Sequence, residues 1–424
     1  MTSQTATRTN YAHPFRPWPI RSFNAIGGPG APRGFVAEKL LRQARQKTKL
    51  ETLSDAPLME PLERLCTALN TEARLSPFGR IVQRERLMGL LVNRLRLDDI
   101  MRRHPEIHDQ PDPDILLIAG LARTGTTLLQ RALAADPSAR ALPSWEALYP
   151  APVPGENLSE SHKREKRAKQ TTKLMQWLAP DFQTVHPVAF DAPEEDILLL
   201  DLTMMSQTAE AVTYVPSFSA WLELQDHTPA YEYLRDVLKT LVWMRPGAPK
   251  VTHWVLKSPH HAEYLSTALD VFPRATVIQT HRTPMETVAS CSSLMVHAHG
   301  LSCDNPDPAA IARHWLRKSV LMAESMKTAR AANPKRNFVD IEYSALMRDP
   351  AKAVKQIYEA HGSPLSDQGE KAAIKAASRP RVKTDKQHAY SLADFSLREE
   401  DVKTAFPDER ARYETRQEAQ ENGV

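Results

Sequence analysis

The stretch that decides the fold reads Ile115-Leu-Leu-Ile-Ala-Gly120-Leu-Ala-Arg123-Thr-Gly125-Thr126-Thr127-Leu128. An apolar run, then a turn bounded by two glycines, then a helix-forming run predict a β-strand, a tight loop and a helix. Backbone N–H groups in such a loop, together with the N-terminus of the following helix, bind phosphate-like anions. We therefore predict an anion-binding loop at 120–127.

This loop lacks one residue of the phosphate-binding loop of nucleoside triphosphate hydrolases. Their pattern, G-x-x-x-x-G-K-[ST], has a lysine after the second glycine, and this chain has Thr126 there. That lysine contacts the terminal phosphates during phosphoryl transfer. Its replacement keeps the anion site but argues against kinase or ATPase chemistry.

Three further apolar runs share the character of residues 115–119. They lie at 254–256, 275–279 and 337–341, and helix-period segments separate them. Short apolar runs alternating with helices are typical of parallel strands buried on both faces. The predicted fold class is α/β, with a P-loop-like central parallel β-sheet flanked by helices, an N-terminal helical subdomain and a helical insertion. Ligands of such sheets bind at the carboxyl ends of the strands.

Composition divides the chain into segments. Residues 1–34 are rich in proline and glycine and are expected to form a flexible, extended arm, whereas 35–104 have helical periodicity. Residues 105–400 are assigned to the α/β domain, with a helical insertion at 155–248 that is expected on the acceptor side. Residues 401–424 are expected to form a polar C-terminal tail.

Composition also limits the class of protein. The 424 residues carry a formal charge of +4, which does not require a nucleic-acid partner. The three cysteines are too few and too widely spaced for a disulfide framework. No apolar run approaches the roughly 18 residues of a membrane span, and the first residues lack the apolar part of a signal peptide. We expect a soluble, cytoplasmic protein.

A second anion-binding motif follows the run at 275–279. Arg282 comes directly after that strand, and Pro284 begins a helix on which Thr287 and Ser290 are three residues apart. A guanidinium with a nearby hydroxyl suits a phosphate monoester. Two anion sites at adjacent strand ends predict a nucleotide that is phosphorylated at two separate places.

These motifs together resemble the sulfotransferases that use 3′-phosphoadenosine 5′-phosphosulfate (PAPS), in particular their large bacterial branch. The segment 123–128 is similar to their 5′-phosphosulfate loop, and Arg282 with Ser290 to their 3′-phosphate motif. Leu256-Lys257-Ser258-Pro259-His260 corresponds to their lysine-bearing segment. The resemblance covers roughly 105–400. It implies PAPS as co-substrate, no metal, and in-line transfer of a sulfuryl group to a hydroxyl or amine.

The resemblance assigns residues to the two ends of the donor. Lys257 is expected to stabilise the leaving bridging oxygen. The 5′-phosphate is expected to bind the side chains or backbone N–H groups of Arg123, Thr124, Gly125, Thr126, Thr127 and Leu128, and the 3′-phosphate Arg282 and Ser290. Lys386 and His388, in a basic segment near the C-terminus, are candidates for a loop that closes over the phosphates.

The base that takes the acceptor proton is left open between two residues. Glu146 follows the predicted loop–helix unit, and Trp145 beside it would desolvate the carboxylate. His260 is the alternative, because related enzymes carry a histidine near the lysine segment. Glu194 and Glu195 precede an apolar helix, where acidic residues complement the helix dipole, and they are candidates for orienting the acceptor.

Two other functions remain open. A P-loop nucleotide kinase would need magnesium, and the strand with Asp340 is its only candidate for a metal-ligating strand. A non-catalytic nucleotide-binding protein, or a nucleic-acid binder using the arm and the basic run 162–169, is the third reading. The sequence leaves open the oligomeric state and the acceptor, a small molecule or a glycan or lipid.

Overall fold

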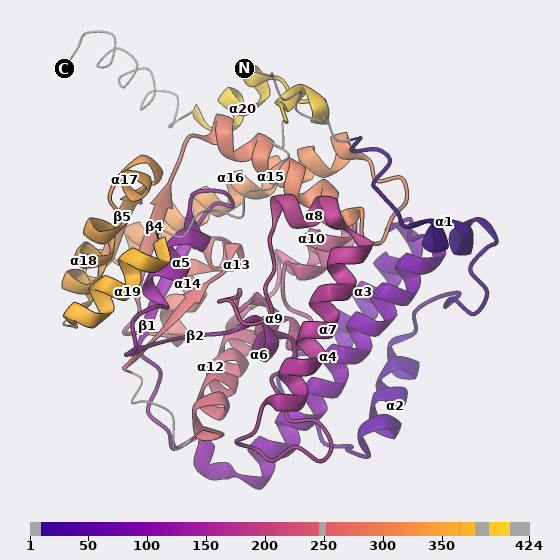
Figure 1. Ribbon diagram of the computed structural model, residues 1–424, viewed down its shortest axis with the longest axis horizontal. Coiled ribbons are helices and arrows are strands. Elements are labelled where there is room, and N and C mark those ends of the chain that lie inside the picture. Colours follow the sequence, from indigo (N-terminus) through magenta and orange to yellow (C-terminus); the bar gives the residue numbers. More distant parts are fainter. Residues whose placement is uncertain (1–9, 246–251, 364, 378–389, 408–424) are drawn as a thin grey trace.

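The computed structural model describes residues 10–245, 252–363, 365–377 and 390–407. Its centre is a parallel sheet with the strand order β2-β3-β1-β4-β5 (Figure 1). The strands are β1 (Ile115–Gly120), β2 (Ala139–Ala141), β3 (His253–Lys257), β4 (Thr276–His281) and β5 (Phe338–Glu342). The predicted α/β class and its four strands are confirmed. Strand β2 was missed, because three residues are too few to form an apolar run.

Both faces of the sheet are buried because side chains alternate along each strand. Ile115 and Leu117 of β1 belong to one apolar cluster, together with residues of α4 (Pro77–Arg103), α12 (Thr228–Trp243) and α14 (Leu265–Val271). Leu116 and Ile118 belong to a second cluster, with residues of α5 (Thr126–Leu133) and α18 (Pro350–His361). All four side chains are fully buried, and burying each contributes about 1.5–3 kcal/mol. The sheet is therefore the common core of helices on both sides.

The N-terminal part is helical, and it begins earlier than predicted. Its helices are α1 (Trp18–Ala25), α2 (Ala37–Thr48), α3 (Met59–Thr71) and α4 (Pro77–Arg103). Helix α1 lies inside the segment expected to be an extended arm, and the buried Arg16 before it donates to the carbonyl oxygens of Gly300 and Cys303. The extended arm is thus wrong for residues 18–25. Proline fits the first turn of a helix, so Pro17 and Pro19 do not oppose α1.

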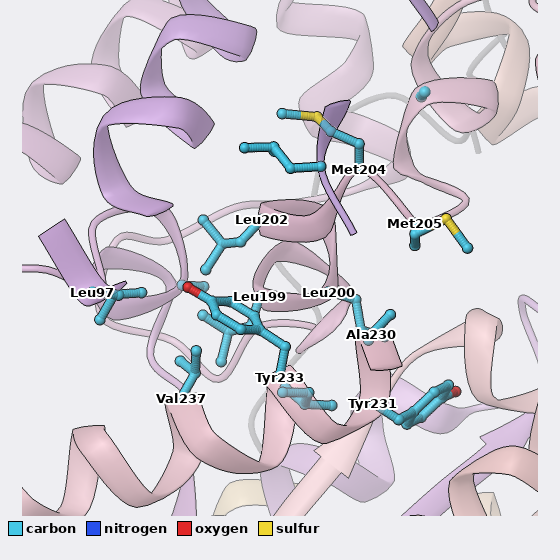
Figure 2. Packing of buried hydrophobic residues seen from close by; sticks show 14 of the residues in the cluster. Leu97, Leu199, Leu200, Leu202, Met204, Met205, Ala230, Tyr231, Tyr233 and Val237 are labelled. Carbon is cyan, nitrogen blue, oxygen red and sulfur yellow. The ribbon is translucent and has the colours of Figure 1, made fainter. Parts of the chain in front are cut away.

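The predicted insertion is largely helical and shares the core of the sheet. It contains α7 (His162–Leu178), α8 (Pro180–Val185), α9 (Ile197–Leu200), α10 (Thr208–Val212), α11 (Pro216–Leu222) and α12 (Thr228–Trp243), with a short helix α6 (Ser144–Leu148) before it. Figure 2 shows Leu97 of α4 close to Leu202 and to Tyr233 and Val237 of α12. The insertion is therefore packed against the N-terminal helices, and its loops are held close to the sheet.

The remaining helices complete the helical layers. They are α5 (Thr126–Leu133), which follows β1, and, in the C-terminal half, α13 (Pro259–Glu263), α14 (Leu265–Val271), α15 (Pro284–His299), α16 (Pro308–Ala332), α17 (Tyr343–Arg348), α18 (Pro350–His361), α19 (Asp367–Ala377) and α20 (Glu399–Ala405). Val402 of α20 and Phe406 are buried in a cluster with Phe395. The tail expected from residue 401 is thus helical at its start, because these apolar side chains have a core to enter.

Proline residues begin several of the long helices, which accounts for part of the high proline content. Ser76, Thr283, Asp307 and Asp349 each precede a proline, and each side chain accepts a hydrogen bond from a backbone N–H in the first turn. The cap satisfies one free N–H, and the proline needs none. None of the helices in the described ranges is long and apolar enough to cross a membrane.

Histidine 299 makes the stability of the fold depend on pH. Burial lowers the pKa of His299 to about 4, although its contact with the Glu210 carbonyl oxygen opposes the shift. The neutral ring therefore stabilises the fold above the unfolded pKa of about 6.5, and this contribution is lost as the pH falls towards 4. The loss amounts to up to about 3 kcal/mol in the free energy of unfolding.

Urea denaturation at pH 7.5, 5.5 and 4.5 tests this prediction with His299→Gln, whose amide still donates to Glu210. The variant should lose less stability on acidification than the parent. Some dependence should remain because burial also lowers the pKa of His227 to about 4. Identical losses in the two proteins would contradict the assignment.

Candidate functional site

The predicted anion-binding loop lies at the carboxyl end of β1 and leads into α5. Arg123 and Gly125 both have left-handed backbone, with φ of 71° and 93°. A Cβ atom on Gly125 would lie 3.0 Å from the Tyr343 ring and 3.1 Å from Leu346, so a side chain there would be crowded by its neighbours and strained by its φ. The hydroxyl of Thr124 lies 2.6 Å from that of Thr280 on β4. Neighbouring strands thus hold the loop in a single shape.

The second anion motif is joined directly to this loop. The Arg123 Nε donates to the Ser290 hydroxyl at 2.9 Å, and the Arg282 Nη1 donates to the Arg123 carbonyl oxygen at 3.1 Å. Arg282 also lies over the Tyr343 ring, 4.2 Å from its centroid, and pairs with Glu286 at 3.0 Å. Arg123 and Ser290 are 167 residues apart in the sequence, and the parallel pairing of β1 with β4 brings them together. The structure therefore places both motifs in one site.

Lys257 lies at the end of β3 and contacts an acidic segment. Its side chain is only 4% exposed, and its Nζ lies 2.5 Å from Glu195 Oε1. Its backbone N–H donates to Asp196 Oδ1 at 2.8 Å. Glu195, which the sequence suggested mainly as a complement to a helix dipole, is thus the carboxylate next to the lysine.

One wall of this site is formed by residues 185–196. We call these residues the wall segment. The Val185 carbonyl oxygen accepts from Arg123 Nη1 at 3.3 Å, and the Glu194 carbonyl oxygen accepts from Gln130 Nε2 of α5 at 2.9 Å. Asp196 supplies the third attachment through Lys257. Loop, helix and lysine strand therefore all hold the same segment.

The wall segment contributes a histidine that sequence reasoning missed. Burial lowers the pKa of His186, Glu194 and Glu195 oppose this shift, and the charges of Lys257 and Arg123 add to it. His186 is therefore a neutral imidazole within electrostatic reach of the groups at the site. No motif surrounds His186 in the sequence, so its position depends on the fold alone.

Glu146 lies in a buried cluster of arginines. Its carboxylate is 3.3 Å from Arg140 and 3.0 Å from Arg245, and the residue is 1% exposed. The guanidinium of Arg245 also covers the Trp145 ring, with 4.7 Å to the centroid. Glu146 is thus paired with two arginines that belong to neither anion motif, and these contacts do not connect it with Lys257 or with the predicted anion-binding loop.

His260 is packed among aromatic rings and has no exposed surface. Its ring centroid is 4.6 Å from that of Tyr264 and 5.3 Å from that of His227. In the part of the chain that the structure describes, neither ring nitrogen has a hydrogen-bond partner, and burial lowers the pKa of His260 well below its usual value. The ring is thus enclosed rather than presented to a ligand.

The remaining candidates fall into two groups. Lys386 and His388 lie outside the described residues. Asp340, the candidate metal ligand of the kinase reading, is bound by Arg330 at 2.7 Å and His281 at 2.8 Å, and these contacts lower its pKa. Within the described ranges, no three His, Cys, Asp or Glu side chains are grouped so that they could hold a metal ion.

Comparisons with known proteins agree with this geometry. The family model described as "Sulfotransferase family" matches residues 113–367. The crystal structure of sulfotransferase STF1 from Mycobacterium tuberculosis H37Rv is similar at 30% identity and a TM-score of 0.75, over 88% of this chain and 99% of that one. Sulfotransferase STF9 from Mycobacterium avium shares the fold at 23% identity and a TM-score of 0.76, over 88% and 95% of the two chains. No curated protein matches this sequence.

Proposed function

This chain belongs to the sulfotransferase family, and we propose that it transfers a sulfuryl group from PAPS to a hydroxyl or amine of an organic acceptor. The observation that carries the proposal is the junction of two anion motifs through Arg123, which contacts Ser290 and Arg282. PAPS carries a 5′-phosphosulfate and a separate 3′-phosphate on its ribose. A single phosphate-binding loop would account for only one of these two groups.

We propose that the backbone N–H groups of 124–128 and the hydroxyls of Thr126 and Thr127 bind the 5′-phosphosulfate. The helix dipole of α5 favours the same anion. Arg282 and Ser290 would bind the 3′-phosphate. In this scheme the Arg123 side chain leaves Ser290 when the donor binds, and its guanidinium turns to the phosphates.

Lys257 and Glu195 are positioned for the transfer step. The acceptor oxygen or nitrogen would form a bond to sulfur while the bond from sulfur to the bridging oxygen breaks. Lys257 would stabilise the negative charge on that oxygen, which leaves as part of adenosine 3′,5′-bisphosphate. Glu195 would take the acceptor proton. In this scheme protein cations supply the charge stabilisation, and no metal takes part.

Among the candidate bases, contact with Lys257 favours Glu195. Glu146 is bound to Arg140 and Arg245, and His260 is enclosed by rings. His186 and Glu194 lie on the same wall segment, and we propose that they orient the acceptor. The wall segment belongs to the insertion 155–248, and this supports our proposal that the insertion lies on the acceptor side.

Nucleotide binding tests the proposed donor. The protein should bind adenosine 3′,5′-bisphosphate at least tenfold more tightly than adenosine 5′-monophosphate, because only the former reaches Arg282 and Ser290. Arg282→Ala should remove most of this preference and leave the affinity for the monophosphate within about threefold. Isothermal titration calorimetry with both nucleotides measures the two effects.

A wild-type protein that binds both nucleotides equally would contradict the proposed donor. Arg348→Ala, on the short helix α17 after β5, is the control for loss of an arginine and should leave the preference intact. Incubation with donor labelled in the sulfuryl group and a cell-metabolite extract would then identify the acceptor class.

A further inference from the structure

A buried polar cluster lies directly behind Lys257. Asp196 Oδ1 accepts from the Lys257 backbone N–H at 2.8 Å, and Asp196 Oδ2 lies 2.7 Å from His261 Nε2 of α13. His261 Nδ1 in turn lies 2.9 Å from the Tyr231 hydroxyl of α12. The three side chains therefore link the wall segment, the lysine strand and two helices.

The cluster is fully enclosed. The side chains of Asp196 and His261 are 1% and 0% exposed, and Tyr231 has no exposed surface. Figure 2 shows Tyr231 at the edge of the apolar cluster, with its hydroxyl directed away from Tyr233 and Val237. Burying a carboxylate is costly unless its oxygens are matched by donors or positive charge. Here Oδ1 accepts a hydrogen bond from the Lys257 backbone, and Oδ2 lies within ion-pair distance of the His261 ring, so the two oxygens contact two different elements.

The two ring nitrogens of His261 face different partners. Nε2 lies beside the Asp196 carboxylate, and Nδ1 lies within hydrogen-bond distance of the Tyr231 hydroxyl. Burial alone would raise the pKa of Asp196, but His261 and the Lys257 N–H outweigh it and lower the pKa. These contacts favour the carboxylate form of Asp196, with the Lys257 N–H bound to Oδ1 and the His261 ring beside Oδ2.

This arrangement fixes the two groups that we assign to transfer. Glu195 is the chain neighbour of Asp196, and Lys257 is the residue whose backbone Asp196 binds. The 2.5 Å contact between Glu195 and the Lys257 ammonium therefore depends on where Asp196 is anchored. Glu195 and Lys257 are 62 residues apart, so the local sequence around either residue does not determine this placement.

We propose that Asp196 and His261, supported by Tyr231, are positioning residues that hold Glu195 and Lys257 in register for sulfuryl transfer. The inference rests on the proposed function, and it adds residues that touch neither donor nor acceptor. Disturbing the cluster should lower the rate of the transfer step and spare nucleotide binding, because the anion-binding loop and Arg282 lie on other strands.

The chain offers a matched control at the opposite end of β3. His253 is also buried, and its Nε2 lies 3.1 Å from the Tyr358 hydroxyl, which donates in turn to Asp136. This second group contains the same three residue types, but its aspartate contacts the tyrosine rather than the histidine, and it lies at the amino end of the strand. Substituting His253 should affect stability without affecting the transfer step.

The experiment compares His261→Gln with His261→Asn, two amides of similar size. The glutamine amide nitrogen reaches the place of Nε2 and can donate to Asp196, whereas the asparagine nitrogen takes the place of Nδ1 and faces Tyr231. The assay is consumption of PAPS with water as the acceptor, which yields sulfate and adenosine 3′,5′-bisphosphate and needs no identified acceptor. Calorimetry with the bisphosphate runs in parallel.

We expect His261→Asn to lower kcat at least tenfold with the bisphosphate Kd unchanged within about threefold, and His261→Gln to recover kcat to within about threefold of the parent. His253→Gln should retain the parental kcat. Equal kcat in the two His261 variants, or an equal loss in His253→Gln, would overturn the proposal and assign the cluster to stability alone.

Hydrogen exchange separates this proposal from the donor assignment. Exchange of the Lys257 backbone amide requires no nucleotide, and it should be at least tenfold faster in His261→Asn than in His261→Gln. Failure of the parent to bind the bisphosphate would overturn the proposed function. Equal exchange rates of the Lys257 amide in the two His261 variants would overturn the positioning role, whether or not the protein binds the bisphosphate. Hydrogen exchange can also be measured if either variant has little activity.

Discussion

Replacing Lys257 with alanine is expected to lower kcat for sulfuryl transfer by about 100- to 1000-fold. Its side chain is 4% exposed and its Nζ lies 2.5 Å from Glu195, at the carboxyl end of β3 next to the predicted anion-binding loop. In the proposed mechanism, a buried positive charge at that place would stabilise charge that develops only as the bridging oxygen leaves. The ground-state affinity for adenosine 3′,5′-bisphosphate should therefore change by no more than about threefold.

Single-turnover measurements with PAPS, combined with calorimetry of bisphosphate binding, check this prediction. Lys355→Ala is the control, since that lysine is exposed on α18 and pairs only with Glu370 in the described structure. Glu195→Gln should lower kcat to a similar degree, and its loss should exceed that of Glu146→Gln in protein shown to be folded. Full activity in Lys257→Ala would refute the assignment of the transfer step.

The second large effect is expected for stability, at Lys318. This side chain of α16 is completely buried, and its Nζ lies 2.6 Å from Glu263, 3.2 Å from Glu210 and 3.2 Å from Glu223. Lys318→Met would leave a group of buried carboxylates without their shared cation. Breaking a buried ion pair from one side costs about 3–5 kcal/mol. Urea denaturation at pH 7.5 should show a loss of that size in the free energy of unfolding.

The pH dependence of this loss provides an internal check. Burial alone would raise the pKa of Glu210, but Lys318 outweighs it and lowers the pKa, so the parent loses this contribution as the pH falls through the folded pKa. Without the cation the folded pKa of Glu210 should lie above its usual value, and the variant should gain stability on acidification. The difference between variant and parent should shrink from pH 7.5 to pH 5. Lys355→Met, on an exposed pair, should cost less than about 1 kcal/mol.

The parts of the site that the sequence predicted are those encoded by contiguous residues. The strand before Gly120, the loop with Arg123 and Gly125, and the helix beginning at Thr126 follow from local propensity and from backbone geometry. Arg282 and Ser290 follow in the same way from a strand end and a helix that starts at Pro284. Once the parallel sheet is inferred, these strand ends must meet at one edge.

The base could not be chosen in this way, because its identity depends on which carboxylates find a partner. Glu146 and Glu195 are both acidic residues near a predicted helix start, and nothing local distinguishes them. In the folded chain Arg140 and Arg245 bind the first, and Lys257 binds the second. His260 and His261 are neighbours in sequence, yet one is enclosed by rings and the other contacts Asp196.

The sequence alone therefore determined the α/β class, the glycine-bounded loop without a lysine at position 126, and the strand end and helix that carry Arg282 and Ser290. These depend on periodicity, glycine conformation and residue order, which act over a few residues. Only the tertiary structure decided that Arg123 joins the two motifs, that Glu195 and Asp196 hold Lys257, and that Glu146 lies in an arginine cluster. Ion pairs and buried hydrogen bonds form between segments that folding brings together. Their energies depend on burial, which arises only when those segments pack against one another.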